Sequence, residues 1–190
     1  MGQGSRLSVF AQPEVFIGLA FMLVLVPLPW LLGWFLAASF HELCHYLAVR
    51  LIGKDISCIE INLTGATMHA GALSERESLF CALSGPLGSL LLLFFSDVFP
   101  ELALCALMQS IFNLLPVYPQ DGGRALMNLA KLILPDKYVN KFCTVIEIAV
   151  LSSLFVLSSL ALFLWRLGML PMLFWFILTI RTARIKIPCK

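Results

Sequence analysis

The stretch that decides the fold is residues 30–53, WLLGWFLAASFHELCHYLAVRLIG, an apolar run that carries two histidines and a glutamate. On a helix, the imidazoles of His41 and His45 lie on one face, a turn apart, and the carboxylate of Glu42 flanks them. The pattern H-E-x-x-H is typical of zinc hydrolases, in which the histidines bind the metal and the glutamate is the base. Because apolar residues surround the motif, we expect the site to lie within the membrane. The alternative is a packed polar cluster without metal, although ionisable groups in hydrocarbon are costly.

The composition of the chain leaves no room for a sizeable soluble domain. Of 190 residues, 60% are hydrophobic and 13% are charged, and the mean hydropathy is +0.94. A helix needs about 20 apolar residues to cross a bilayer. We therefore expect an all-α polytopic membrane protein, a single domain over residues 1–190, with six transmembrane helices. The apolar runs that predict them are 15–26, 30–53, 78–96, 101–118, 142–164 and 167–180.

The positions of the basic residues predict the orientation of these spans. Pro27-Leu28-Pro29 separates the first two runs by a turn at the outer face. With the N-terminus inside, 12 of the 13 Lys and Arg residues are cytoplasmic, and only Arg166 lies outside. We therefore expect a multi-pass protein of the cell membrane with both termini in the cytoplasm. The net charge of +2 reflects this orientation, and no basic patch indicates nucleic-acid binding.

Residues 56–70 break the helical pattern. Ile59 and Ile61 alternate with polar residues, a period of two that predicts a strand, and Gly65 offers a turn. We expect a small β-hairpin on the cytoplasmic side, which is either an ordinary connection or a part of the functional site. His69 within it is expected to be a solvated side chain rather than a ligand.

A second polar segment ends the fourth apolar run. Residues 113–124 read NLLPVYPQDGGR, and their prolines and glycines predict that the segment is not helical. Non-helical backbone at membrane depth is tolerated only where protein or a water-filled cavity covers it. We expect the segment to line a cavity and to offer Asp121 as a carboxylate ligand; the alternative is a plain loop.

Three segments are expected at one depth in the membrane. His41 and Asn113 each lie roughly 18 Å from the outer face at 1.5 Å per residue. Residues 84–88, SGPLG, interrupt the third run at roughly 20 Å from the same face. All three are expected at the metal site, although the small residues of the third also suit close helix packing.

These motifs together resemble the site-2 protease family of intramembrane zinc metalloproteases. The resemblance implies that His41, His45 and Asp121 coordinate Zn²⁺ and that Glu42 is the general base. It also implies that zinc-activated water cleaves transmembrane or membrane-proximal segments of membrane proteins, which the hairpin edge holds as an added strand. The motifs span most of the chain: H-E-x-x-H at 41–45, a hairpin, S-G-P-L at 84–87 and N-x-x-P-x-x-P-x-D-G at 113–122.

The resemblance also bears on partners and on further residues. The compact layout looks like the bacterial sporulation-type branch without a PDZ or C-terminal regulatory module, so we expect a regulatory membrane partner besides the substrate. Asn113, Tyr118, Gly85 and Pro86 are candidates for binding substrate or supporting the metal ligands. Ser89 stands where the family often has Asn, which puts a substrate contact there in question.

Two residues near these motifs are expected to have structural rather than catalytic roles. Glu147 lies roughly 9 Å into the fifth run, and we expect it to pair with a basic residue such as Arg124. Cys44 lies about 60° from His41 around the helix, and we expect it to pack rather than bind metal. The six cysteines are scattered through spans and inner loops, which argues against disulfides.

Two rival functions remain open at this point. A catalytically silent homologue that binds membrane proteins would need neither Glu42 nor all three ligands. A metal transporter could hold His and Asp at mid-membrane, but it needs no general base and commonly shows paired halves, which this chain lacks.

Overall fold

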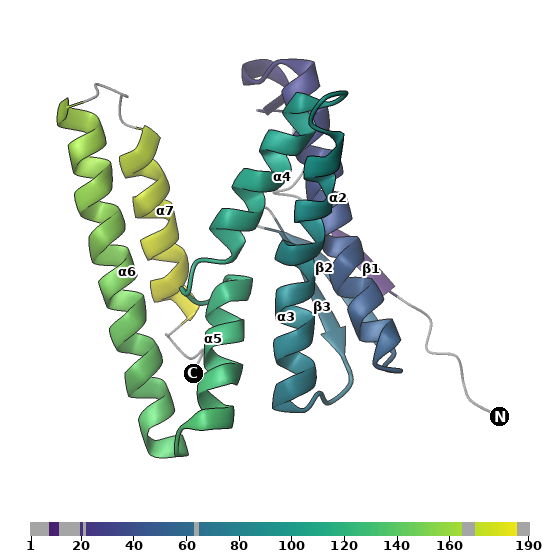
Figure 1. The fold of residues 1–190 in the computed structure, drawn as a ribbon, viewed down its shortest axis with the longest axis vertical. Helices are drawn as coiled ribbons and strands as arrows, with labels where there is room; N and C mark the ends of the chain where they lie inside the picture. The colour runs from purple at the N-terminus through teal and green to yellow at the C-terminus, as the bar shows by residue number, and fades with distance from the viewer. Residues whose placement is uncertain (1–7, 12–19, 21, 63–64, 165–169, 186–190) are drawn as a thin grey trace. The chain divides into compact units, whose positions relative to one another are not determined.

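The structure is a computed structural model that describes residues 8–11, 20, 22–62, 65–164 and 170–185. It is mostly helical, with one small sheet, and divides into two compact units, Met1–Asn113 and Leu114–Lys190. The elements of the first unit (Figure 1) are β1 Ser8–Ala11, α2 Leu28–Leu51, β2 Ile56–Asn62, β3 Gly65–Ala70, α3 Glu75–Ser89, the 3₁₀-helix η1 Leu90–Phe95 and α4 Pro100–Asn113. The elements of the second unit are α5 Asp121–Ile133, α6 Asp136–Leu164 and α7 Leu170–Ile185.

Helix α2 is the centre of the first unit. It begins directly after Pro27 and carries Pro29 in its first turn, so the predicted break between the first two apolar runs is confirmed. The helix contacts both α3 and α4. A Cβ at Gly33 would lie only 3.1 Å from the backbone of α4, so glycine there permits the close approach of the two helices. Gly53 follows α2 with a φ of 78°, a conformation that favours glycine and ends the helix.

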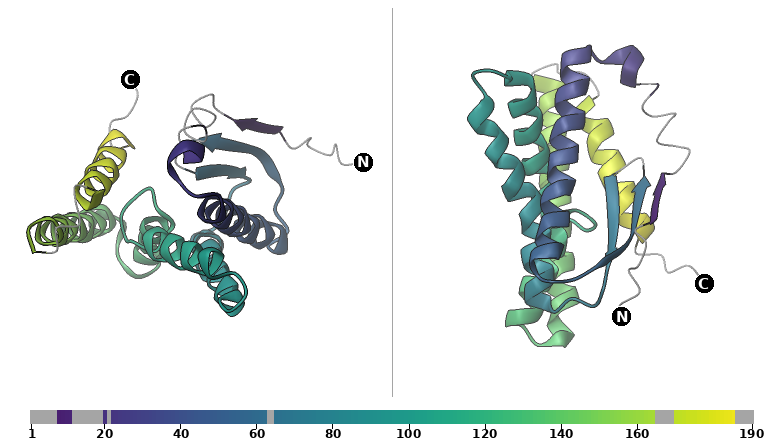
Figure 2. Two further views of the ribbon diagram at one scale, coloured as in Figure 1. Left: turned by 90° about the horizontal axis from the view of Figure 1, so that it is seen from above. Right: turned by 90° about the vertical axis from the view of Figure 1, so that its right-hand side faces the viewer.

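The predicted hairpin is confirmed by β2 and β3, which pair antiparallel from Ile56 opposite Ala70 to Asn62 opposite Gly65. The strand β1, which the sequence pattern did not indicate, pairs parallel with β2 and makes the sheet order β1-β2-β3. Figure 2 shows the three strands side by side next to α2. Buried side chains of Val49, Ile56 and Cys81 join α2, the sheet and α3 in one core.

The predicted interruption of the third run at residues 84–88 is wrong. Helix α3 continues through the segment, with Pro86 fully buried inside it, and the change to 3₁₀ geometry comes only at η1. A capping box at Ser74 and Glu77 fixes its N-terminus. The small residues of this segment therefore serve close packing, the alternative that their size allowed.

Among its described residues, the second unit has three helices, and α6 contacts both α5 and α7. The rings of Trp175 on α7 and Phe155 on α6 pack together with their centroids 4.8 Å apart. The indole N–H of Trp175 donates a hydrogen bond of 2.9 Å to the carbonyl of Leu151. The prediction that residues 113–124 are not helical is correct only between the end of α4 and the start of α5. Helix α5 begins at Asp121 and includes Gly122 and Gly123. Both glycines are buried where the chain packs closely, and neither ends the helix.

Two helical segments among the described residues, Glu75–Phe95 and Asp136–Phe163, are long and apolar enough to cross a bilayer. Half of the first predicted span, residues 15–19 and 21, lies outside the described part of the chain. The number of spans and the orientation of the termini therefore stay predictions.

Candidate metal site

Both histidines of the motif on α2 are oriented through their Nδ1 atoms. His45 Nδ1 lies 2.8 Å from the carbonyl oxygen of Cys81, and because a carbonyl can only accept, the imidazole donates. His41 Nδ1 lies 3.2 Å from Ser89 Oγ, whose own proton goes to the carbonyl of Gly85 at 2.9 Å, so this imidazole also donates. Both hydrogen bonds select the tautomer that leaves the lone pair on Nε2.

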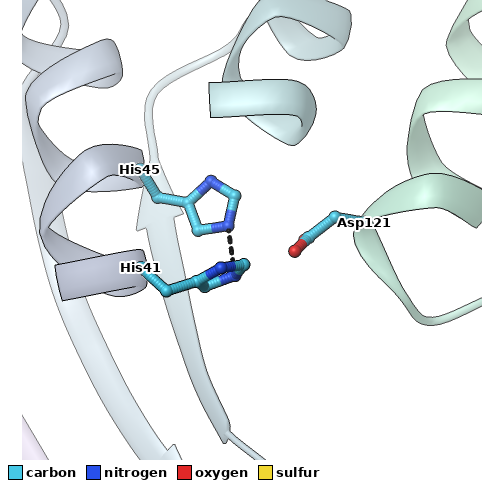
Figure 3. A group of neighbouring side chains, drawn as sticks. All are labelled: His41, His45 and Asp121. Atoms are coloured by element: carbon cyan, nitrogen blue, oxygen red, sulfur yellow. Dashed lines mark hydrogen bonds between the residues drawn. The ribbon is translucent and has the colours of Figure 1, made fainter. Parts of the chain in front are cut away.

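The two Nε2 atoms converge. They lie 3.1 Å apart, and the rings meet edge to face at 84° (Figure 3). Two lone pairs at this distance repel each other unless a cation lies between them, which is either a shared proton or a metal ion. Two nitrogen ligands of a tetrahedral zinc, at about 2.0–2.1 Å from the metal, are about 3.3 Å apart. The histidine pair therefore fits zinc in donor chemistry and in spacing.

Helix α3 holds the His45 ring from the side. A Cβ at Gly85 would overlap the imidazole of His45, so only glycine permits this contact. A Cβ at Gly88 would likewise overlap the sulfur of Cys44. Cys44 thus packs against α3, in the manner expected of it, and it is not among the described residues that together could hold a metal.

Asn113 ends α4 beside His41, with its side-chain Nδ2 atom 3.4 Å from His41 Nε2. The structure therefore brings together the three segments that were expected at one depth, on α2, α3 and the end of α4. His41 is 3% exposed, so its imidazole is screened from bulk solvent, whereas His45 and Asn113 are half-buried.

Asp121 belongs to the second unit, where it is the first residue of α5 and half-buried. A Cβ at Gly122 would overlap the carbonyl of Leu114, so the turn before α5 packs tightly against the helix start. A carboxylate in the first helical turn is also favoured by the helix dipole. Among the described residues, His41, His45 and Asp121 are the set of side chains that could hold a metal ion (Figure 3).

The remaining predicted residues lie in different places. Glu42 follows His41 on α2 and is half-buried, whereas Pro86 is fully buried within α3. The carbonyl of Tyr118 accepts a hydrogen bond of 3.1 Å from the Thr182 hydroxyl. Tyr118 and Glu147 both line a cavity of the second unit.

Ser89 has a role that its sequence position alone did not reveal. The sequence suggested only a departure from a family Asn, but the hydroxyl orients His41 and is fully buried. A serine four residues after Gly85, on the same helical face, was the signal that could have indicated it. The carbonyl of Cys81 had no such signal, because any residue supplies a carbonyl.

Comparisons with known proteins identify one fold. No protein-family description and no curated protein sequence matches the chain. The solved structure of a Site-2 Protease from Methanocaldococcus jannaschii is similar, with a TM-score of 0.68 and 18% sequence identity. The match covers 100% of this chain and 95% of that one, so the likeness of fold extends over the whole described molecule.

Proposed function

We propose that this chain, which shares the fold of a site-2 protease, is an intramembrane zinc metalloprotease of that family, in a compact layout like the sporulation-type branch. The convergence of the His41 and His45 Nε2 atoms at 3.1 Å carries the proposal, because the hydrogen bonds of both rings prepare them as ligands. A catalytically silent homologue would not need hydrogen bonds that orient both imidazoles as metal ligands.

Asp121 is proposed as the third ligand. Two imidazoles and one carboxylate are a usual protein ligand set for a catalytic zinc, which keeps one coordination position open. When bound, zinc lowers the pKa of a water molecule to about 7 and polarises the carbonyl to be cleaved.

The residues of the chain supply the remaining steps. Glu42, half-buried beside His41, takes the proton of the attacking water and delivers it to the leaving amide nitrogen. Ser89 and the Cys81 carbonyl hold the two imidazoles in place throughout. The Asn113 amide, whose Nδ2 atom lies 3.4 Å from His41 Nε2, is proposed to orient the substrate carbonyl beside the metal.

The substrate is proposed to be a transmembrane or membrane-proximal segment of another membrane protein. A helical segment hides its carbonyls in hydrogen bonds and must unwind before it is cleaved. Among the described strands, β2 pairs with β1 over Cys58–Ile61 on one side and with β3 on the other. The outer edge of the hairpin is therefore that of β3. We propose that the unwound substrate pairs there, and that regulation comes from a membrane partner.

Replacing Glu42 by Gln tests the proposal, because it removes the base and leaves the ligands. The purified variant in detergent should hold as much zinc as the wild type and lose peptide-bond cleavage, measured by mass spectrometry of membrane-protein substrates. Glu101→Gln, which removes a carboxylate at the start of α4, is the matched control and should cleave normally. Undiminished cleavage by Glu42→Gln would remove Glu42 from the mechanism, and cleavage by neither wild type nor control would favour the silent homologue.

A further inference from the structure

The second unit contains a cavity of about 410 Å³ that the zinc chemistry does not use. Its volume lies within the range of sites that take a small ligand or a side chain. The wall is formed by the turn after α4, the first half of α5 and the first half of α6. Gly123 and Tyr118 line it, so the cavity borders the same turn that leads into Asp121.

The α6 wall of the cavity is polar. Asn140, Thr144 and Glu147 lie at spacings of four and three residues, so they share one helical face. Asn140 is exposed and Glu147 is 5% exposed, so the polar face runs from the surface to a buried carboxylate. At 1.5 Å per residue this distance is about 10 Å along the helix.

The part of the wall that α5 and the preceding turn supply is apolar. Leu126 and Met127 on α5 and Pro116 before it line the cavity. Among the residues that line it, Glu147 alone carries a formal charge. The cavity thus combines apolar side chains from α5 with one carboxylate, that of the buried Glu147.

We propose that this cavity is a specificity pocket that binds the basic side chain, lysine or arginine, of the polypeptide substrate. A basic side chain has an apolar stem and a cationic tip, which match the apolar α5 wall and the carboxylate of Glu147. Asn140 and Thr144 offer hydrogen-bond acceptors to the same tip. The identity of the polypeptide as substrate rests on the proposed protease function, whereas the binding of a cation in the cavity does not.

Cys143 lines the cavity one turn before Glu147 and provides a probe of cation binding that needs no cleavage. In full-length protein with the other five cysteines replaced by serine, three methanethiosulfonate reagents can be compared, bearing an aminoethyl, hydroxyethyl or sulfonatoethyl group. The Cys143 thiolate attacks the reagent's sulfenyl sulfur, a mixed disulfide forms, and methanesulfinate leaves. Rates are normalised to those with a free thiol in the same detergent.

The cationic reagent should modify Cys143 about tenfold faster than the neutral one, and the anionic reagent should be slowest. Glu147→Gln should bring the normalised ratio to about one, while Glu147→Asp keeps it. Asp136→Asn removes an exposed carboxylate from the same helix and should leave the ratio unchanged. Equal normalised rates in the wild type, or a cation preference that survives Glu147→Gln, would overturn the proposal.

A second measurement separates a polypeptide from a small amine such as a lipid headgroup. Fluorescein-labelled peptides that differ only in carrying lysine or norleucine at one position are titrated with Glu42→Gln protein, and binding is read by anisotropy. The lysine peptide should bind about tenfold more tightly, and Glu147→Gln should abolish the difference. Equal affinities together with a cation preference at Cys143 would assign the cavity to a small amine and overturn the substrate claim. Neither readout depends on cleavage, so a failure of the proposed protease function is recognised separately.

Discussion

At the scale of single residues, the hydrogen bonds to the Nδ1 atoms of the two histidines orient the imidazoles for metal binding. His41 and His45 each use Nδ1 as a donor, to a serine hydroxyl and to a backbone carbonyl, and this leaves both Nε2 lone pairs available for metal. Partners of this kind fix the tautomer and the ring orientation in metal sites generally. The zinc affinity should therefore depend on Ser89 although Ser89 is not a ligand.

Ser89→Ala should weaken zinc binding about 10- to 100-fold, because His41 loses the acceptor that fixes its ring. The measurement is competition with a chromophoric zinc chelator. Ser110→Ala is the matched control: Ser89 and Ser110 are both 0% exposed, and each donates to the carbonyl four residues before it. An equal loss of affinity in both variants would mean that packing, rather than the bond to His41, explains the effect.

At the scale of elements, α3 positions the site, since it supplies Gly85, the Cys81 carbonyl and Ser89. Its start is fixed by reciprocal bonds, from Ser74 N to Glu77 Oε2 at 2.7 Å and from Glu77 N to Ser74 Oγ at 3.4 Å. These bonds satisfy backbone donors that the first turn of a helix otherwise leaves without an internal partner.

Ser74→Ala should lower the free energy of unfolding by about 1 kcal/mol, because one of these donors loses its acceptor. The change is measured by SDS titration in mixed micelles. Ser153→Ala, at an exposed serine whose hydroxyl donates to the Val150 carbonyl of its own helix, should change the free energy by less than about 0.5 kcal/mol. Equal effects of the two substitutions would show that the capping box contributes nothing measurable.

Some of the elements could be predicted from the sequence pattern alone. The helix that carries the histidines, the break before it and the hairpin after it follow from apolar periodicity, proline and alternation, which are local signals. Strand β1 has four residues and exists only by pairing with β2, which lies far along the chain, so no local signal predicts it. Helix α5 was missed because its two buried glycines look like helix breakers, whereas they permit close packing.

The candidate site was predictable to a similar extent. The two histidines come from a spacing rule, Asp121 from the Pro- and Gly-rich segment that contains it, and the closeness of Asn113 to His41 from counting residues through two spans. The partners of the Nδ1 atoms depend on how α2 and α3 pack, and that packing is a tertiary property. The Cys81 carbonyl could therefore be identified only from the fold, and the bond of Ser89 to His41 depends on the same packing.

At the scale of the whole molecule, the account depends on the orientation of the chain in the membrane. Single cysteines at Ser74 and Lys137, in a background without other cysteines, should resist a membrane-impermeant thiol reagent in intact cells. A cysteine at Asp97 should react, because the positive-inside rule places it outside. All three positions are exposed, so burial in the protein does not confound the comparison. Labelling at Ser74 and Lys137 but not at Asp97 would invert the topology.

The central claim is that the histidine pair on α2 and Asp121 hold a zinc ion, and zinc K-edge X-ray absorption of the purified full-length protein tests it most directly. The account predicts about one zinc per chain, with only nitrogen and oxygen neighbours at about 2.0–2.2 Å and an imidazole scattering pattern that indicates two histidines. Asp121→Ala should remove one oxygen neighbour or the metal itself. Absence of zinc after careful preparation, or a sulfur neighbour at about 2.3 Å that points to Cys44, would contradict the account.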